Sequence, residues 1–93
     1  MVTAIVFVKA DTDKIPEVAD QIAGLESVSE VYSVTGKIDL IAIVHVRDYE
    51  EVEEVIAGHL NKVPGVQDTE THLAFRAYSN SDLGAAFSLG VGD

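Results

Sequence analysis

Four stretches of the chain carry the hydrophobic patterns of β-strands. Residues 2–9 and 40–46 are almost continuously apolar and rich in β-branched side chains, which is typical of strands covered on both faces. Residues 28–34 contain more polar positions, and residues 66–75 alternate apolar or threonine side chains with charged ones. Because alternation of this kind marks a half-solvated strand, we expect the first pair at the centre of a sheet and the second pair at its edges.

Two segments between these strands have apolar residues at helical spacing. Asp11, Thr12 and Asp13 can cap the first helix, and Pro16 is tolerated in its first turn. Asp48 followed by Glu51 is an Asp-led variant of the capping box and begins the second helix. The positions predicted to be buried are Ile15, Val18, Ile22 and Leu25 in the first helix, and Tyr49, Val52, Val55, Ile56, Leu60 and Val63 in the second.

The order strand, helix, strand occurs twice, which predicts an α+β fold of the ferredoxin-like βαββαβ type. Right-handed crossovers place the strands in the antiparallel order 4-1-3-2, with both helices on one face. The other face of the two most apolar strands then has no cover, and exposed apolar surface of this size marks an interface. We therefore expect at least a homodimer that packs sheet against sheet.

Composition excludes several classes of function. Sixteen acidic and six basic residues give a formal net charge of −10, which disfavours direct binding to nucleic acid and to anionic membranes. The chain has no cysteine, and it shows neither a membrane span nor a signal peptide, so we expect a cytoplasmic protein. At 93 residues it is predicted to form a single domain.

Residues that could perform catalysis or bind metal do not cluster in the predicted fold. His45, His59 and His72 fall on different elements, so we expect no metal site and no cofactor. Ser33, Thr35 and Ser79 have no patterned base beside them in sequence. The sequence therefore predicts that the protein is not an enzyme.

The hairpin tip at residues 34–39 carries the best candidate for a binding site. It combines a flexible glycine, Gly36, with exposed backbone amides, the Thr35 hydroxyl, the Lys37 cation and the Asp39 anion. These groups can bind an amino acid, since amides and a hydroxyl donate to its carboxylate and Asp39 pairs with its ammonium group. An ordinary polar turn explains the same residues equally well.

This turn and its flanks resemble the ligand-binding (RAM) domain of the Lrp/AsnC, or feast/famine, transcription regulators. The resemblance covers residues 1–77 and leaves residues 78–93 as a C-terminal tail. It rests on Val-Thr-Gly-x-x-Asp-Leu at 34–40, the helix after Asp48, Val-Pro-Gly-Val at 63–66, and Thr69-x-Thr71. The resemblance implies a dimeric α/β barrel, octamer-like assembly of the dimers, and small amino acids bound between dimers. The ligand-binding residues that it implies are Thr35, Gly36, Lys37 and Asp39, with Gln67, Thr69 and Thr71 from a neighbouring subunit.

Regulators of this family usually carry an N-terminal helix-turn-helix domain, whereas this chain begins at its first strand. We therefore expect a stand-alone amino-acid-sensing module that modulates transcription through partner proteins, including full-length Lrp/AsnC regulators. In the tail, Phe87 and Leu89 are candidates for docking on a neighbour. Two alternatives are an oligomer with a purely structural role and a small dimeric α/β-barrel monooxygenase.

Overall fold

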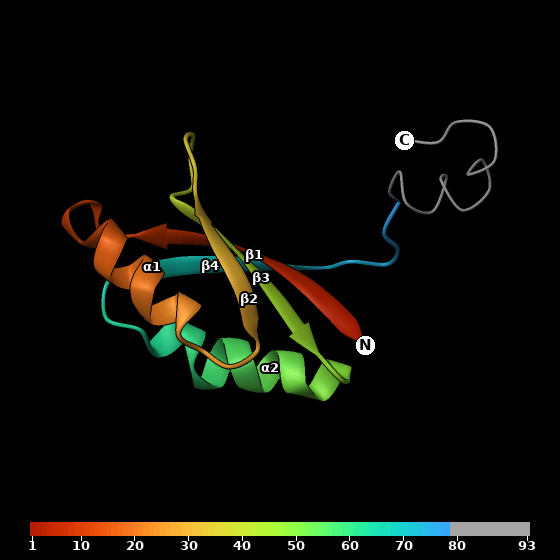
Figure 1. Ribbon diagram of the computed structural model, residues 1–93. Helices are drawn as coiled ribbons and strands as arrows, with labels where there is room; N and C mark the ends of the chain where they lie inside the picture. Colours follow the sequence, from red (N-terminus) through yellow and green to blue (C-terminus); the bar gives the residue numbers. More distant parts are fainter. Residues whose placement is uncertain (79–93) are drawn as a thin grey trace.

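The computed structural model describes residues 1–78 and contains the six predicted elements in the predicted order (Figure 1). A short 3-10 turn, η1, precedes α1, and a second one, η2, follows α2. The predicted docking of Phe87 and Leu89, and all of the predicted tail except residue 78, lie outside the described residues. The elements are β1 (Val2–Ala10), η1 (Thr12–Lys14), α1 (Ile15–Ala23), β2 (Val28–Ser33), β3 (Leu40–Val46), α2 (Tyr49–Gly58), η2 (Leu60–Lys62) and β4 (Val66–Leu73).

The strands form one antiparallel sheet in the order β2-β3-β1-β4, which confirms the ferredoxin-like prediction. Val6 in β1 pairs with Ala42 in β3 on one side and with Thr71 in β4 on the other. The two continuously apolar strands are therefore central, and the two more polar strands are at the edges. Figure 1 shows both helices packed on the same face of this sheet.

The core lies between the helices and one face of the sheet. Val18 and Ile22 of α1 are completely buried, in one cluster with small strand residues such as Val6 and Ala42. In the second helical segment, five of the six predicted positions are buried, namely Val52, Val55, Ile56, Leu60 and Val63. Tyr49 is a correction, because 64% of its surface is exposed.

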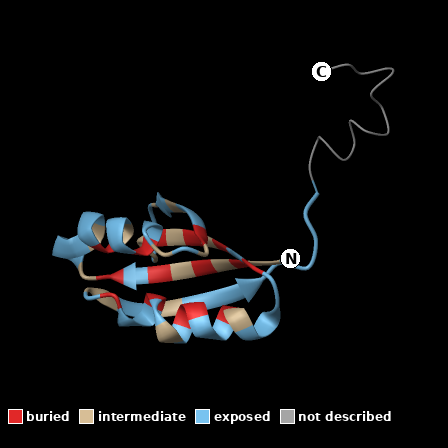
Figure 2. Cartoon of the chain, turned by 60° about the horizontal axis from the view of Figure 1, so that its bottom comes forward, coloured by how far each residue is buried: buried red, intermediate tan, exposed pale blue. Residues whose placement is uncertain are grey.

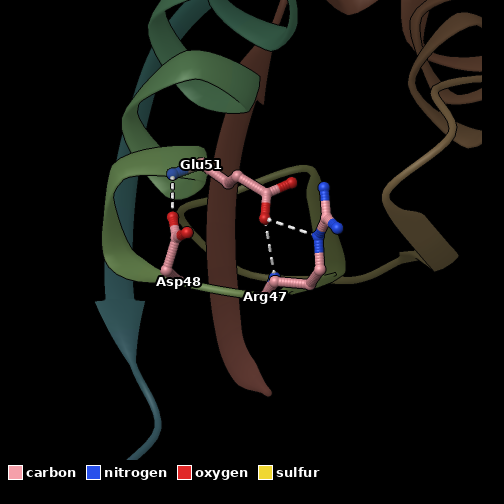
Figure 3. Close-up of polar contacts among 3 residues, drawn as sticks. All are labelled: Arg47, Asp48 and Glu51. Atoms are coloured by element: carbon pink, nitrogen blue, oxygen red, sulfur yellow. Dashed lines mark hydrogen bonds and ion pairs between the residues drawn. The ribbon is translucent and has the colours of Figure 1, made fainter.

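The second helix begins with a capping arrangement close to the predicted one (Figure 3). Asp48 Oδ1 accepts a hydrogen bond from the Glu51 backbone N–H (3.0 Å). Glu51 Oε1 accepts from the Arg47 backbone N–H (3.0 Å) and lies 3.4 Å from Arg47 Nε. In a standard capping box the Glu would bind the amide of the N-cap residue itself, so here its carboxylate reaches one residue further back.

The predicted side-chain cap of the first helix is wrong. Asp11 precedes the 3-10 turn η1 and makes no capping hydrogen bond, and Lys14 occupies the N-cap position of α1. Pro16 does lie in the first turn of α1, as expected. The Asp11 carboxylate is instead hydrogen-bonded to Gln67, a residue of β4.

The opposite face of the sheet carries no helix among residues 1–78. Side chains alternate along β1 and β3, so every second residue points to this side and is less buried than its neighbours (Figure 2). Its centre is apolar and its margins are charged or polar. We call it the open face and define it by Thr3, Ile5, Phe7, Lys9, Glu30, Tyr32, Ile41, Ile43, His45, Glu70 and His72.

Candidate functional site

The β2-β3 connection, residues 34–39, forms a hairpin tip that projects beyond the sheet (Figure 1). The Val34 N–H donates to the Asp39 carbonyl (3.0 Å) and closes the loop at its base. Gly36 has a φ of +108°, a conformation that favours glycine, and no atom lies within 4 Å of the position of a Cβ. Thr35, Gly36 and Lys37 are all exposed, so this tip presents its polar groups to any molecule that approaches.

Asp39 is half-buried at the base of the same loop and anchors it to β1. Its Oδ2 accepts a hydrogen bond from the Ala10 N–H (2.8 Å), and its own N–H donates to the Val8 carbonyl (2.9 Å). The sequence predicted that this carboxylate pairs with a ligand's ammonium group. The structure gives one carboxylate oxygen a structural partner, so the other oxygen, Oδ1, is the better placed one for such a contact.

Lys9 adds a cation to this region that was not among the candidate residues predicted from the sequence. Its Nζ donates to the Lys37 carbonyl (3.2 Å), which brings the ammonium group of β1 to the hairpin. Lys9 is the single charged residue of β1, and a lone charge in a strand this apolar was the signal in the sequence that could have identified it. Two lysines, Lys9 and Lys37, therefore accompany the loop amides that could bind a carboxylate.

The three candidates on β4 divide between two places. Gln67 lies at the same end of the sheet as the hairpin, where its Nε2 donates to Asp11 Oδ1 (2.8 Å). The Thr69 hydroxyl donates to Asn61 Oδ1 (2.7 Å), and Thr71 lies beside α2. Thr69 and Thr71 are thus on the helix-covered side, and one chain does not bring them to its own hairpin. Their predicted role for a neighbouring subunit stays a prediction.

The histidines do not converge in the described part of the chain. Thr3 Oγ1 lies 3.0 Å from His45 Nδ1 on β3, His72 Nε2 lies 2.8 Å from Glu70 Oε2 on β4, and His59 follows α2. Strand β1 separates β3 from β4. Within residues 1–78, no group of three or more His, Cys, Asp or Glu side chains is placed to bind a metal.

One titratable group on the open face is perturbed. Tyr32 donates a hydrogen bond to Glu30 Oε2 (2.6 Å). This bond, with smaller contributions from desolvation and from the carboxylate's charge, raises the pKa of Tyr32 above its ordinary value. Both residues line a hollow of about 620 Å³ that lies between the open face and residues 74–77.

A model of the Lrp/AsnC ligand-binding domain matches residues 3–83. The chain belongs to the Lrp/AsnC ligand-binding domain family. The HTH-type transcriptional regulator PH1692 of Pyrococcus horikoshii is 39% identical over 71 residues, which are 76% of this chain and 47% of the relative. The chain thus spans about half the length of the curated relatives that it matches. Those relatives are named as transcriptional regulators.

Solved structures have the same fold as this chain. The protein TTHA0845 from Thermus thermophilus is 43% identical with a TM-score of 0.80, over 85% of this chain and 99% of the other. The regulator NMB0573 of Neisseria meningitidis, solved as a complex with L-Met, is 18% identical with a TM-score of 0.76, over 84% and 52% of the two chains. The boundary between the ligand-binding domain, residues 1–77, and the C-terminal tail, residues 78–93, remains a prediction. Among the described helices, none is long and apolar enough to cross a membrane.

Proposed function

We propose that this chain is an amino-acid-sensing module that binds its ligand at the β2-β3 hairpin. The observation that carries the proposal is the match of residues 3–83 to the Lrp/AsnC ligand-binding domain. The Neisseria protein of the same fold was solved with L-Met, which supports an amino acid as the ligand class. We also propose that the protein is cytoplasmic, as its sequence predicts.

The hairpin residues have the chemistry that such a ligand requires. Backbone amides at Gly36 and Lys37, the Thr35 hydroxyl and the Lys9 and Lys37 ammonium groups would bind the ligand's carboxylate. The free oxygen of Asp39 would accept from the ligand's ammonium group. Gln67, Thr69 and Thr71 would come from another subunit, because Thr69 and Thr71 lie on the opposite side of the sheet from Lys9.

A site shared between subunits requires assembly, and we propose that the first step is a dimer through the open face. Ile5, Phe7, Ile41 and Ile43 form an apolar centre there, partly exposed in a single chain. Lys9 lies on the same face as Glu30 and Glu70, so a two-fold axis can bring opposite charges together. The dimers would then associate further through the hairpins, as in an octamer-like ring.

We further propose that the module modulates transcription through regulators that carry the same ligand-binding domain. The curated relatives are regulators of about twice the matched length, and mixed assembly through a shared fold is the economical link to them. Native mass spectrometry after co-expression with a family regulator from the same genome tests this step. Mixed oligomers are expected, and separate homo-oligomers for every such regulator would contradict it.

The ligand proposal is tested by a thermal-shift screen of the assembled protein against the twenty amino acids. A ligand present at 100 times its Kd stabilises the native state by about 2.7 kcal/mol, which gives a measurable rise in Tm. The critical variant is Asp39→Asn, since its amide oxygen can still accept from Ala10 N–H while the charge is lost. Asp39→Ala would remove this structural bond as well.

We expect a selective Tm shift in the wild type and its loss in Asp39→Asn. The matched control is Asp20→Asn, which removes one exposed carboxylate from α1. Equal shifts in wild type and Asp39→Asn would contradict the assigned site. No shift with any amino acid, in a protein that light scattering shows to be assembled, would favour the structural oligomer.

A further inference from the structure

The outer edge of β4 has unpaired backbone groups in the described chain. The Ala74 N–H donates to the Thr3 carbonyl (2.9 Å), so Ala74 faces β1. In an antiparallel ladder the direction alternates with each residue, and hence Thr71 and Leu73 direct their N–H and C=O groups away from β1. No strand among residues 1–78 lies beyond β4. Such an edge is a template for one more strand.

An apolar groove lies directly beside these edge groups. It has a volume of about 390 Å³ and runs between β4 and α2 on the helix-covered side of the sheet. Leu73 is 42% exposed there and Tyr49 is 64% exposed. A strand added to β4 would direct alternate side chains into this groove. Its lining residues are Tyr49, Val52, Glu53, Ile56, Ala57, Thr71 and Leu73.

The chain itself contains a segment with the required pattern. Residues 85–91 read Ala-Ala-Phe-Ser-Leu-Gly-Val, in which Ala85, Phe87, Leu89 and Val91 alternate with small residues. This period of two is that of a strand with one apolar face. The segment has no charge, so the acidic surface of α2 around the groove does not repel it.

The distance along the chain also permits this arrangement. Residues 74–84, between the end of β4 and the segment, can extend about 35 Å at 3.3 Å per residue. An added strand would lie only about 4.8 Å from β4. The segment also begins after residue 83, where the match to the family domain ends, so it would be an addition to the common fold.

We propose that residues 85–91 of the same chain return along β4 as an additional antiparallel strand. Phe87, Leu89 and Val91 then pack in the groove against α2, and the Thr71 and Leu73 backbone groups become paired. This strand would cover the edge of β4 and leave the open face free. It does not involve the hairpin residues of the ligand site, which lie away from this groove, but Thr71 lines the groove, so the strand would compete with the proposed contact of Thr71 to a neighbouring subunit's ligand.

Engineered disulfides test the position of the segment. The chain has no cysteine, so Ala57→Cys with Leu89→Cys introduces one pair, and Ala57→Cys with Ser88→Cys is the matched control. We expect the first pair to form an intramolecular disulfide about tenfold faster than the control, since neighbouring strand residues point to opposite faces. Equal rates for the two pairs, or disulfides only between copies, would overturn the proposal.

Amide hydrogen exchange gives a test that needs no cross-link. In the full chain, Thr71 and Leu73 amides are expected to exchange at least about tenfold more slowly than in Phe87→Asp, whereas Ser88→Asp keeps the protection. The core amides of β1 report that each variant is folded. Identical exchange at Thr71 and Leu73 in all three proteins would overturn the proposal. So would protection that rises with protein concentration and persists in Phe87→Asp, because a second copy would then cover the edge.

Discussion

The two faces of the sheet differ in the size of the apolar side chains that they carry. Toward the helices, β1 and β3 place mostly Ala and Val, including Ala4, Val6 and Ala42, which are completely buried. Toward the open face, the same strands place Ile and Phe, including Phe7 and Ile43, which are only partly buried. The bulkier apolar residues therefore occupy the face that a single chain leaves uncovered.

This difference indicates what each face packs against. Small side chains let two helices approach the sheet closely and fill the space with Val18, Ile22 and their neighbours. A sheet face turned permanently to water would need no large apolar residues, and contiguous exposed apolar patches in proteins mark interaction sites. We infer that the helix face is the core of one chain and that the open face becomes buried only in the assembled protein.

The largest expected effect is on the helix face. Ile22→Ala removes a completely buried side chain and should lower the free energy of unfolding by about 2–5 kcal/mol, measured by urea denaturation. In the matched variant Ile43→Ala, the loss should be small in dilute protein and grow with protein concentration, since the proposed dimer buries Ile43. Equal, concentration-independent losses in the two variants would break the distinction between the faces.

Two glycines with positive φ give a second contrast, because Gly65 packs against the first helix and Gly36 lies in open space at the hairpin. Gly65 has a φ of +99°, and an added Cβ would lie 2.6 Å from Val18 Cγ2. Gly65→Ala should therefore cost about 2–4 kcal/mol from strain and overpacking together. Gly36→Ala has a similar φ but open space, so its cost should be about 1–2 kcal/mol. Thermal or urea unfolding of both variants measures the two losses of stability. A larger loss in Gly36→Ala than in Gly65→Ala would contradict the predicted clash with Val18.

A smaller effect is expected at the start of α2. Asp48→Ala removes the cap on the Glu51 N–H and should destabilise the protein by about 1 kcal/mol. Arg47→Ala, which removes an ion pair whose Arg side chain is 89% exposed, should cost less than about 0.5 kcal/mol. Urea denaturation compares the two, and an equal or larger loss in Arg47→Ala would contradict the assignment of the cap to Asp48.

The smallest effect concerns the ionisation of Tyr32 on the open face. Because its pKa is raised in the folded state, the stabilisation from this group is present below pH 10 and is lost as the pH rises through the higher, folded-state pKa. Titration of tyrosinate absorbance, taken as the difference from Tyr32→Phe, should show this raised value. Glu30→Gln should move it back toward the ordinary value, and an unchanged titration would contradict the role of the Glu30 hydrogen bond.

The elements and their order were predictable because hydrophobic period and strand composition are local properties. Tyr49 shows where this reasoning ends: helical spacing placed it on the apolar stripe, but the described sheet stops at β4 and no further strand covers it. Asp11 was assigned to a cap because local pattern cannot anticipate its partner Gln67, which lies far along the chain.

The hairpin tip could also be located from the sequence, since glycine and polar residues between two strands identify a turn. The position of Lys9 beside Lys37, and the bond from Ala10 to Asp39, depend on how β1 lies against the end of β3. Strand register brings these residues together, and no local pattern encodes it. The same register places Gln67 at the hairpin end of the sheet and Thr69 and Thr71 on its helix-covered side.

Sedimentation equilibrium of the full chain and of Ile43→Asp tests the central claim most directly. The chain mass is 9.9 kDa. We predict a wild-type mass of at least twice this value, and a folded monomer for Ile43→Asp because a carboxylate at the centre of the interface cannot be desolvated without a partner. Gln21→Asp, on the exposed surface of α1, should assemble like the wild type. A monomeric wild type, or an Ile43→Asp protein that assembles normally, would contradict the conclusion that the open face joins two copies of this chain.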